Sequence, residues 1–369
     1  MKPLISFVLV LTSCFIFNTI AAQQKTENLI IVTLDGMRWQ EVFGGADKAL
    51  IHNKQFTKNI GAVKEMFWHN QSLERRKKLF PFLWNVVAQQ GQLYGNRKYG
   101  NFVNIANKYN FSYPGYNEIF TGYPDIMVKS NDTIKNQNQN VLEFINQQPS
   151  YQGKVAVFAT WEVMPYILNK WRSNLYINAH EDTVYLKNSH LQLINDMQNL
   201  TAKPLDVRPD ILTYMLAREY LKSYTPKVMY ISFDETDDFA HQGMYDQYLR
   251  SAHAQDKMLA DLWAYLQQHP TYKDKTTLII TADHGRGDIK KQNWVDHGED
   301  IPESNQIWVA VIGPDTPPSG ELKTPGMVYQ KQLAATFAAM LGFNFTANHP
   351  VASPCNSMFV PLQGLVGKK

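Results

Sequence analysis

Five short apolar runs, each bounded by polar or turn-forming residues, alternate along this chain with segments of helical periodicity. The apolar runs predict buried strands at residues 29–34, 155–158, 228–233, 277–281 and 307–312. Apolar residues that recur with a period near 3.6 predict helices at residues 80–87, 206–224, 246–268 and 333–341. This alternation predicts an α/β fold, with a mostly parallel central sheet covered by helices on both faces.

The first 22 residues have the pattern of a secretory signal peptide. Lys2 precedes a mainly apolar stretch, and small residues up to Ala22 supply a cleavage site. The alternative is a lipoprotein signal, because residues 11–14 resemble a lipobox that ends at Cys14. The apolar stretch continues past Cys14, which favours cleavage near Ala22. We therefore expect a periplasmic or secreted protein whose mature chain has no transmembrane anchor.

Residues 23–369 are expected to form a single domain, and 44% apolar residues supply its core. Insertions are predicted around residues 39–110 and 123–153, where the strand–helix rhythm is poor. These segments either roof the functional site or decorate the surface. The 36 basic and 33 acidic residues leave a net charge of +3, so nothing in the charge predicts binding of duplex nucleic acid.

Acidic and histidine residues stand where predicted strands end. Asp35 follows the first apolar run, and Asp283 and His284 follow the run at 277–281. In open α/β sheets, ligands bind in the crevice beyond the carboxyl ends of the strands. Carboxylate oxygen and imidazole nitrogen suit zinc, and carboxylates also accept manganese. These residues therefore predict a metal site at this edge of the sheet.

A second group of candidate ligands follows the third predicted strand, in the sequence DETDDFAH. Asp237 and His241 are four residues apart, which on a helix places both side chains on one face. Asp234, directly at the strand end, and Asp238 remain alternatives to Asp237. His297 stands in a second Asp-His-Gly turn. Together the two groups predict a site for two divalent cations.

Ser112 is the candidate nucleophile, in the sequence NFSYPGYNEIFTG. Pro114 is favoured in the first turn of a helix, so Ser112 is expected just before the positive end of a helix over 115–121. Backbone N–H groups there suit a phosphate. The simpler alternative is that Ser112 only caps this helix. Coordination to a metal would remove the hydroxyl proton and make serine a nucleophile at neutral pH.

In this order, the motifs resemble those of the alkaline phosphatase superfamily, and most closely the type I phosphodiesterases/nucleotide pyrophosphatases and bacterial predicted phosphoglyceromutases. The resemblance covers residues 28–314 and implies an alkaline phosphatase-like sandwich with catalytic Ser112. Its D-x-x-G-H element matches residues 237–241 and so selects Asp237. The resemblance implies two divalent ions, zinc or manganese, the first held by Asp35, Ser112, Asp283 and His284 and the second by Asp237, His241 and His297.

The residues around the nucleophile depart from the family pattern. The phosphodiesterases have Asn three residues after the nucleophile, where this chain has Gly115. Asn117 is the expected substitute that binds a phosphate oxygen. A phosphate monoester needs more positive charge around it than a diester does, and the candidates for this charge are Arg38, Lys108, Lys170 and Arg172.

We therefore expect an exported phosphoesterase that cleaves a small-molecule phosphate mono- or diester through a phosphoserine on Ser112. The alternatives are a sulfatase, a phosphomutase or a non-catalytic metal-binding relative. The sulfatase motif continues x-P-x-R after its nucleophile, and Tyr116 stands here in place of the Arg. Secretion speaks against a mutase of central metabolism, and the complete ligand set speaks against a non-catalytic protein.

Overall fold

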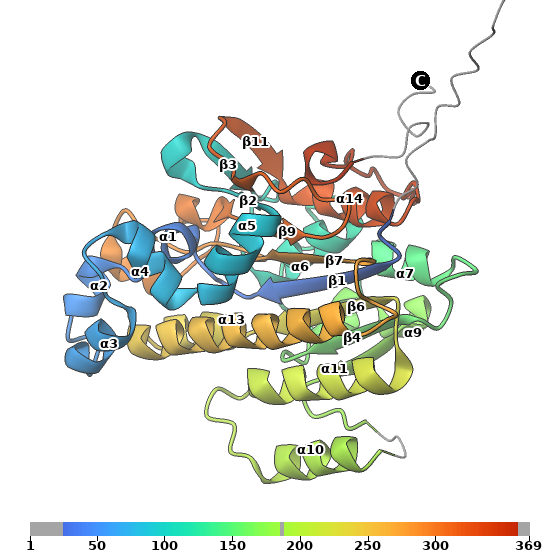
Figure 1. Ribbon diagram of the computed structural model, residues 1–369, viewed down its shortest axis with the longest axis horizontal. Helices are drawn as coiled ribbons and strands as arrows, with labels where there is room; N and C mark the ends of the chain where they lie inside the picture. Colours follow the sequence, from blue (N-terminus) through green and yellow to red (C-terminus); the bar gives the residue numbers. More distant parts are fainter. Residues whose placement is uncertain (1–24, 185–187, 361–369) are drawn as a thin grey trace, which may run out of the picture.

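The computed structural model describes residues 25–184 and 188–360, so the predicted signal peptide and Cys14 lie outside the described residues. Its main feature is an eight-stranded sheet (Figure 1). Across the sheet the order is β10 (Gly320–Glu321), β2 (Gln92–Tyr94), β9 (Val309–Ile312), β7 (Thr276–Thr281), β1 (Asn28–Leu34), β6 (Val228–Phe233), β4 (Val155–Ala159) and β5 (Tyr176–Ala179). The strands from β7 to β5 are parallel, whereas β9 is antiparallel to β7 and β2. The predicted, mostly parallel sheet is therefore confirmed.

A smaller, three-stranded sheet lies beside the main one. It is formed by β11 (Gly326–Tyr329), β3 (Asn101–Asn104) and β8 (Gln306–Ile307). The fifth predicted strand, over 307–312, is two strands in the structure. The strand is interrupted at Trp308, and β8 and β9 on its two sides belong to different sheets. The sequence did not reveal β2, β3 and β5, which are three or four residues long and contain polar positions.

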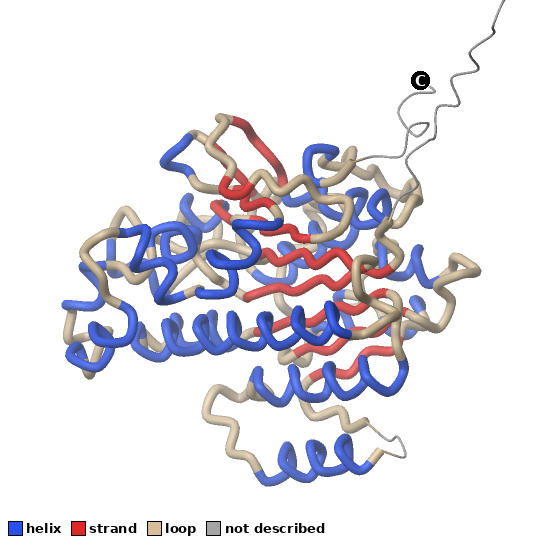
Figure 2. Tube along the Cα trace, in the orientation of Figure 1, coloured by secondary structure: helices blue, strands red, loops and turns tan. Residues whose placement is uncertain are grey.

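Helices cover both faces of the main sheet. Every residue of β1, β4, β6 and β7 is buried, although alternate side chains point to opposite faces. On one face α11 (Asp210–Tyr224) contacts α13 (Tyr245–Gln268), and on the other α6 (Ser112–Thr121), α7 (Val141–Asn146) and α14 (Leu333–Met340) contact one another. Figure 2 shows the sheet between these blue helices.

The predicted helices over 246–268 and 333–341 match α13 and α14 to within one residue. The helix predicted from residue 206 begins only at Asp210, because Pro209 disfavours a helical conformation for the residue before it. The helix predicted over 80–87 includes the π-helical turn η1 (Leu83–Val87). None of the described helices is long and apolar enough to cross a lipid bilayer.

The first predicted insertion, residues 39–110, contributes β2 to the main sheet and β3 to the smaller one. It also contains α1 (Trp39–Gly44), α2 (Lys48–His52), α3 (Ile60–Phe67), α4 (Ser72–Leu79), η1, α5 (Ala88–Gln90) and η2 (Arg97–Tyr99). Residues 123–153 form a long loop followed by α7. The other helices are α8 (Met164–Ile167), α9 (Lys170–Ser173), α10 (Ser189–Leu200), α12 (Glu235–His241), η3 (Lys291–Val295), η4 (Pro302–Asn305), η5 (Gln330–Gln332) and η6 (Asn356–Met358).

The carboxyl ends of three neighbouring strands position the candidate site. β1 lies between β6 and β7, with Leu34 opposite Phe233 and Thr33 opposite Thr281. The residues that follow these strands therefore meet at one edge of the sheet. This is the edge at which open α/β sheets bind ligands.

Candidate metal centre

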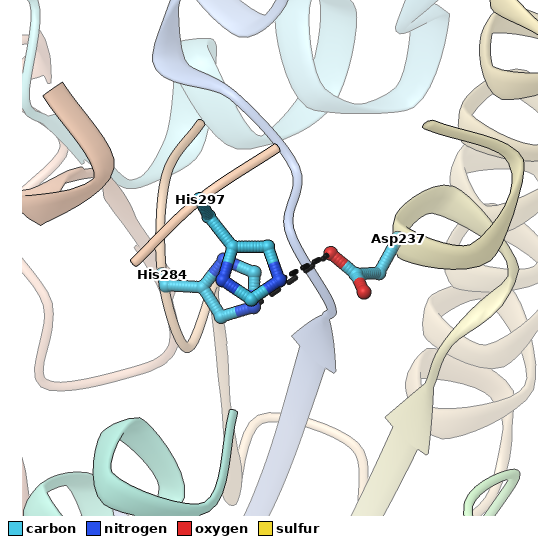
Figure 3. Close-up of side chains that lie close together, drawn as sticks. All are labelled: Asp237, His284 and His297. Atoms are coloured by element: carbon cyan, nitrogen blue, oxygen red, sulfur yellow. Dashed lines mark ion pairs between the residues drawn. The ribbon is translucent and has the colours of Figure 1, made fainter. Parts of the chain in front are cut away.

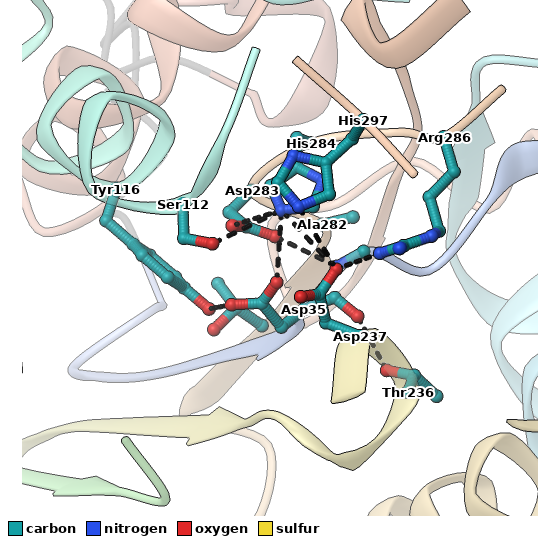
Figure 4. A network of polar contacts seen from close by, with 12 residues as sticks. Asp35, Ser112, Tyr116, Thr236, Asp237, Ala282, Asp283, His284, Arg286 and His297 are labelled. Atoms are coloured by element: carbon teal, nitrogen blue, oxygen red, sulfur yellow. Dashed lines mark hydrogen bonds and ion pairs between the residues drawn. The ribbon is translucent and has the colours of Figure 1, made fainter. Parts of the chain in front are cut away.

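Three predicted ligands approach one nitrogen atom of a fourth, His284, beyond the ends of β1 and β7 (Figure 4). The Nε2 atom of His284 lies 3.2 Å from Asp35 Oδ1 and 3.4 Å from Asp283 Oδ2. Ser112 Oγ lies 3.3 Å from the same nitrogen. The carboxylates and the imidazole are at most 1% exposed, and Ser112 is 6% exposed. These side chains could hold a metal ion, and we refer to them as the first half-site of the candidate centre.

The hydrogen bonds of this half-site leave unshared lone pairs on His284 Nε2, Asp35 Oδ1 and Asp283 Oδ2, and these atoms face one another. The Nδ1 atom of His284 lies 2.9 Å from the Gly285 carbonyl, which only accepts hydrogen bonds, so Nδ1 carries the proton and Nε2 presents a lone pair. Among the described residues, Asp35 Oδ1 and Asp283 Oδ2 are buried and accept no hydrogen bond. A cation between these atoms would satisfy them, so the donor set fits a divalent metal.

The raised pKa values of Asp35 and Asp283 are also consistent with a site for a divalent metal. Burial, and then the charge of Asp237, raise the pKa of Asp35 well above its ordinary value. Burial and the charge of Asp35 likewise raise the pKa of Asp283. Crowded buried carboxylates repel one another, and a bound divalent cation reverses this effect.

A second half-site is built around Asp237 on α12. Figure 3 shows its carboxylate facing the rings of His284 and His297. Asp237 Oδ1 lies 3.7 Å from the Nε2 atom of each ring, and Asp237 Oδ2 lies 3.0 Å from His241 Nε2. Thr236 donates a 2.6 Å hydrogen bond to the Asp35 carbonyl, which ties α12 to the end of β1. Asp237, His241 and His297 are thus brought together as predicted.

The structure distinguishes Asp237 from its two neighbouring aspartates. Asp234 is the N-cap residue of α12, and its backbone N–H donates to Asp210 Oδ1. Neither Asp234 nor Asp238 belongs to the clusters of potential metal ligands among the described residues, whereas Asp237 does. The geometry therefore favours the aspartate that the family resemblance selected.

Arg286 is a buried cation that the sequence analysis missed. Its Nη1 atom donates to Asp237 Oδ1, and its Nε atom donates to the Trp294 carbonyl at 2.8 Å. Burial raises the pKa of Asp237, but Arg286 and then His297 lower it well below its ordinary value. An Arg that follows a His-Gly turn carries no recognisable signal, because most such residues are exposed.

Ser112 is the first residue of α6, and the N-cap residue Phe111 makes no side-chain capping hydrogen bond. The helix therefore begins three residues earlier than predicted, and Ser112 does not act as its cap. This position places the hydroxyl group in the first turn of α6, at the positive end of the helix dipole, which favours an anion.

Gly115 has a steric reason for departing from the family pattern. A Cβ atom at this position would lie 2.5 Å from the Asp283 carbonyl oxygen. The close approach lets the first turn of α6 pack directly against the end of β7, which brings Ser112 next to Asp283 and His284. Any larger residue would push these elements apart.

Asn131 and Tyr116 are further functional candidates that the sequence analysis missed. Asn131 Oδ1 accepts a 2.9 Å hydrogen bond from the backbone N–H of Tyr113, the residue after the nucleophile. Tyr116 donates to Asp35 Oδ2 at 2.8 Å. Asn131 lies in a polar segment without periodicity, and the sequence gives Tyr116 no role beyond its place at the arginine position of the sulfatase motif.

The structure does not bring the predicted substrate-binding residues into the cluster. Asn117 lies five residues after Ser112 and so faces another side of α6, where it donates to the Tyr123 carbonyl at 2.8 Å. Arg38 is fully buried and pairs with Glu41. The other predicted cations pair elsewhere, Arg172 with Glu143, Lys108 with Glu299 and Lys170 with Asp182.

Comparison with solved structures shows the fold. Alkaline phosphatase PafA superposes with a TM-score of 0.60 at 9% identity, over 90% of this chain and 99% of that chain. A phosphonate monoester hydrolase of Agrobacterium radiobacter gives 0.53 at 12% identity, over 90% and 77%. A 2-O GAG sulfatase gives 0.56 at 11% identity, over 90% and 74%. These likenesses confirm the alkaline phosphatase-like α/β fold.

Comparison of sequences shows the family. Residues 50–337 match the family model described as type I phosphodiesterase / nucleotide pyrophosphatase, whereas no curated protein matches significantly. The narrower resemblance to the phosphoglyceromutase branch stays a prediction. The match covers most of the chain, and family and fold together indicate a hydrolase of phosphate or sulfate esters. The chain therefore belongs to the type I phosphodiesterase / nucleotide pyrophosphatase family of the alkaline phosphatase superfamily.

Proposed function

We propose that this chain is a two-metal phosphodiesterase with Ser112 as its nucleophile. The observation that carries the proposal is the convergence of the Ser112 hydroxyl with the lone pairs of the first half-site, directly beside the second half-site. One divalent ion, zinc or manganese, would be held by Asp35, Ser112, Asp283 and His284, and the other by Asp237, His241 and His297.

The reaction proposed is an in-line displacement at phosphorus. Two divalent cations bound here would lower the pKa of the Ser112 hydroxyl and stabilise charge on the leaving oxygen. Ser112 Oγ loses its proton to solvent and forms a bond to phosphorus, while the bond to the leaving alcohol breaks. Water then cleaves the Oγ–phosphorus bond and regenerates Ser112. The positive end of the α6 dipole and the NH₂ group of the Asn131 amide, whose oxygen accepts from the Tyr113 N–H, are the features we expect to stabilise the other phosphate oxygens.

The charges around the site favour a diester over a monoester. A monoester carries one more negative charge, which requires additional cations near the phosphate. The four cations that the sequence suggested for this purpose are each paired with a carboxylate, in the pairs Arg38–Glu41, Lys108–Glu299, Lys170–Asp182 and Arg172–Glu143. A phosphodiester therefore fits the site better.

Two parts of the proposal rest mainly on the sequence. Export rests on the signal pattern of residues 1–22. The preference for phosphate over sulfate rests on Tyr116, which occupies the position of the sulfatase arginine and is engaged with Asp35. Sulfatase activity is the alternative, so the test compares phosphate esters with a sulfate ester.

The proposal is tested with metal-loaded protein and three nitrophenyl substrates. Bis-p-nitrophenyl phosphate should be cleaved faster than p-nitrophenyl phosphate, and p-nitrophenyl sulfate slowest. Ser112→Ala should remove the activity, whereas Ser353→Ala, at an exposed serine outside the cluster, should retain it. Absence of phosphate-ester cleavage by protein with two bound metal ions, or a preference for the sulfate, would contradict the proposal.

A further inference from the structure

Helix α6 carries two buried side chains, besides Ser112, that are connected to the half-sites by hydrogen bonds, Tyr116 directly and Glu118 through the loop at 106–110. Tyr116 is 1% exposed and Glu118 is 0% exposed. We propose that both are positioning residues, Tyr116 for Asp35 in the first half-site and Glu118 for His297 in the second. The inference rests on the two-metal site of the proposed function, but it concerns metal affinity rather than the ester that is cleaved.

Tyr116 acts on the carboxylate orientation of Asp35. Its hydroxyl donates to Asp35 Oδ2 at 2.8 Å, whereas Asp35 Oδ1, 3.2 Å from His284 Nε2, has no hydrogen-bond partner within residues 25–184 and 188–360 (Figure 4). One oxygen is therefore held by α6 while the other faces the metal position. Such partners of metal ligands fix the ligand's orientation and strengthen metal binding.

Buried hydroxyl groups set the direction of this hydrogen bond. Ser232 Oγ donates to the Tyr116 hydroxyl at 3.3 Å, and Thr33 Oγ1 donates to Ser232 Oγ, also at 3.3 Å. Because the Tyr116 oxygen accepts from Ser232, its own proton is directed to Asp35. The hydroxyl chain runs from neighbouring strands β1 and β6 to the first half-site.

Glu118 anchors the loop that precedes the nucleophile. Its Oε1 atom accepts from the backbone N–H groups of Ala106 (2.9 Å) and Lys331 (3.0 Å). Its Oε2 atom accepts from the backbone N–H (2.8 Å) and the side-chain amide (2.9 Å) of Asn107. Both oxygens are needed as acceptors, so an amide at this position would turn an NH₂ group toward N–H donors in either orientation.

The anchored loop reaches His297 through two further hydrogen bonds. Asn107 Oδ1 accepts from the backbone N–H of Asn110 at 3.1 Å. The Asn110 carbonyl oxygen lies 3.2 Å from His297 Nδ1, which leaves Nε2 free to face Asp237 and His241. Asn110 has a left-handed backbone, with φ of 53°, a conformation that asparagine tolerates better than most residues. Glu118 therefore acts on the ring orientation of His297 through the segment 106–110.

Through these two hydrogen-bonded paths, helix α6, which begins with Ser112, supports ligands of both half-sites. A rigid element that carries the nucleophile and supports ligands on either side keeps their relative positions fixed. The two paths share no residue, so each should be separable from the other by substitution.

The test measures zinc affinity in proteins that retain one half-site. His241→Ala disables the second half-site and Asp283→Asn the first. Tyr116→Phe and Glu118→Gln are then introduced singly into each of these full-length proteins, and zinc is titrated against a chelating dye. Tyr116→Phe should weaken zinc binding by about 10–100-fold only where the first half-site remains, and Glu118→Gln by a similar factor only where the second remains.

Each substitution is the matched control for the other, because both alter a buried hydrogen-bonding group on the same helix. Equal weakening of both half-sites, or no weakening of either, would overturn the inference. If Glu118→Gln does not fold, Asn107→Ala breaks the same path while Glu118 keeps its backbone donors, and it should weaken only the second half-site. Failure to cleave any ester, with both affinities changed as expected, would count against the proposed function alone.

Discussion

The Nε2 atoms of His241 and His297 lie 3.0 Å apart, although the two residues are 56 positions apart in the chain. His241 ends α12, whereas His297 lies in the loop after η3. Both rings also approach the carboxylate of Asp237. Three ligands of these types at one point are typical of a zinc site that keeps a position open for substrate.

His297→Ala should remove one of two bound metal equivalents, because it deletes a ligand of the second half-site only. The loss of transition-state stabilisation by one cation is worth several kcal/mol, so activity should fall roughly 1,000-fold. Elemental analysis of dialysed protein together with kcat/KM measures both effects. His190→Ala, at an exposed histidine, is the control and should retain both metals. Two tightly bound equivalents in His297→Ala would contradict this assignment.

Gly115→Ala should impair catalysis without adding or removing any functional group. The new methyl group would meet the Asp283 carbonyl oxygen and displace the first turn of α6 from β7. A displacement of about 1 Å can cost on the order of 100-fold in rate. Gly44→Ala is a suitable control, since its Cβ atom would meet nothing within 4 Å. Steady-state kinetics that are unchanged in Gly115→Ala would show that this close approach does not align the nucleophile.

Metal-free protein should become less stable as the pH rises from about 4 toward 8. The folded-state pKa values of Asp35 and Asp283 lie well above their ordinary value near 3.9, so over this range the folded state binds more protons than the unfolded state. Stability therefore falls with rising pH. Glu235 and Asp238, whose pKa values are raised to about 7 by burial and then by the charges of Asp210 and Asp237, act in the same direction.

Thermal unfolding with a chelator measures this effect, and saturating zinc should abolish it. Asp35→Asn removes one buried charge, so it should raise the unfolding midpoint of metal-free protein at pH 8 and reduce the stabilisation by zinc. A midpoint that stays constant or rises from pH 5 to pH 8 in metal-free protein would show that the carboxylates are not crowded in this way.

Arg286→Met should make the second half-site more sensitive to acid. Arg286 is the main opposite charge that lowers the pKa of Asp237 against burial. Without it the Asp237 carboxylate is protonated at higher pH, so the midpoint of zinc release on acidification should move upward by about one to three pH units. Zinc release is followed by a dye titration in Asp283→Asn protein, which retains only this half-site. Arg250→Met, at an exposed arginine, should leave the midpoint unchanged.

Much of the fold and of the ligand set follows from local patterns in the sequence. β1, β6 and β7 are continuous apolar runs, so their ends, and with them Asp35 and Asp283, could be located from hydrophobicity alone. The choice of Asp237 required the family motif, because three aspartates share the first turn of α12 or its cap. The spacing of those aspartates is compatible with more than one ligand.

The remaining features depend on contacts between segments that are distant in sequence. Tyr116 and Glu118 look like ordinary helix residues until α6 is packed against β1 and the 106–110 loop. Arg38 and Arg172 were predicted as substrate ligands, but buried Arg38 pairs with Glu41 and exposed Arg172 pairs with Glu143. Such partners cannot be read from spacing along the chain.

The central claim, covalent catalysis by Ser112, is tested most directly by trapping the intermediate. Metal-loaded protein is mixed with bis-p-nitrophenyl phosphate, quenched in acid within one turnover and digested for mass spectrometry. The account predicts a nitrophenyl phosphate group on the peptide that contains Ser112, absent from Ser112→Ala. Cleavage of the diester at an undiminished rate by Ser112→Ala, or a phosphoryl group on another residue, would contradict it.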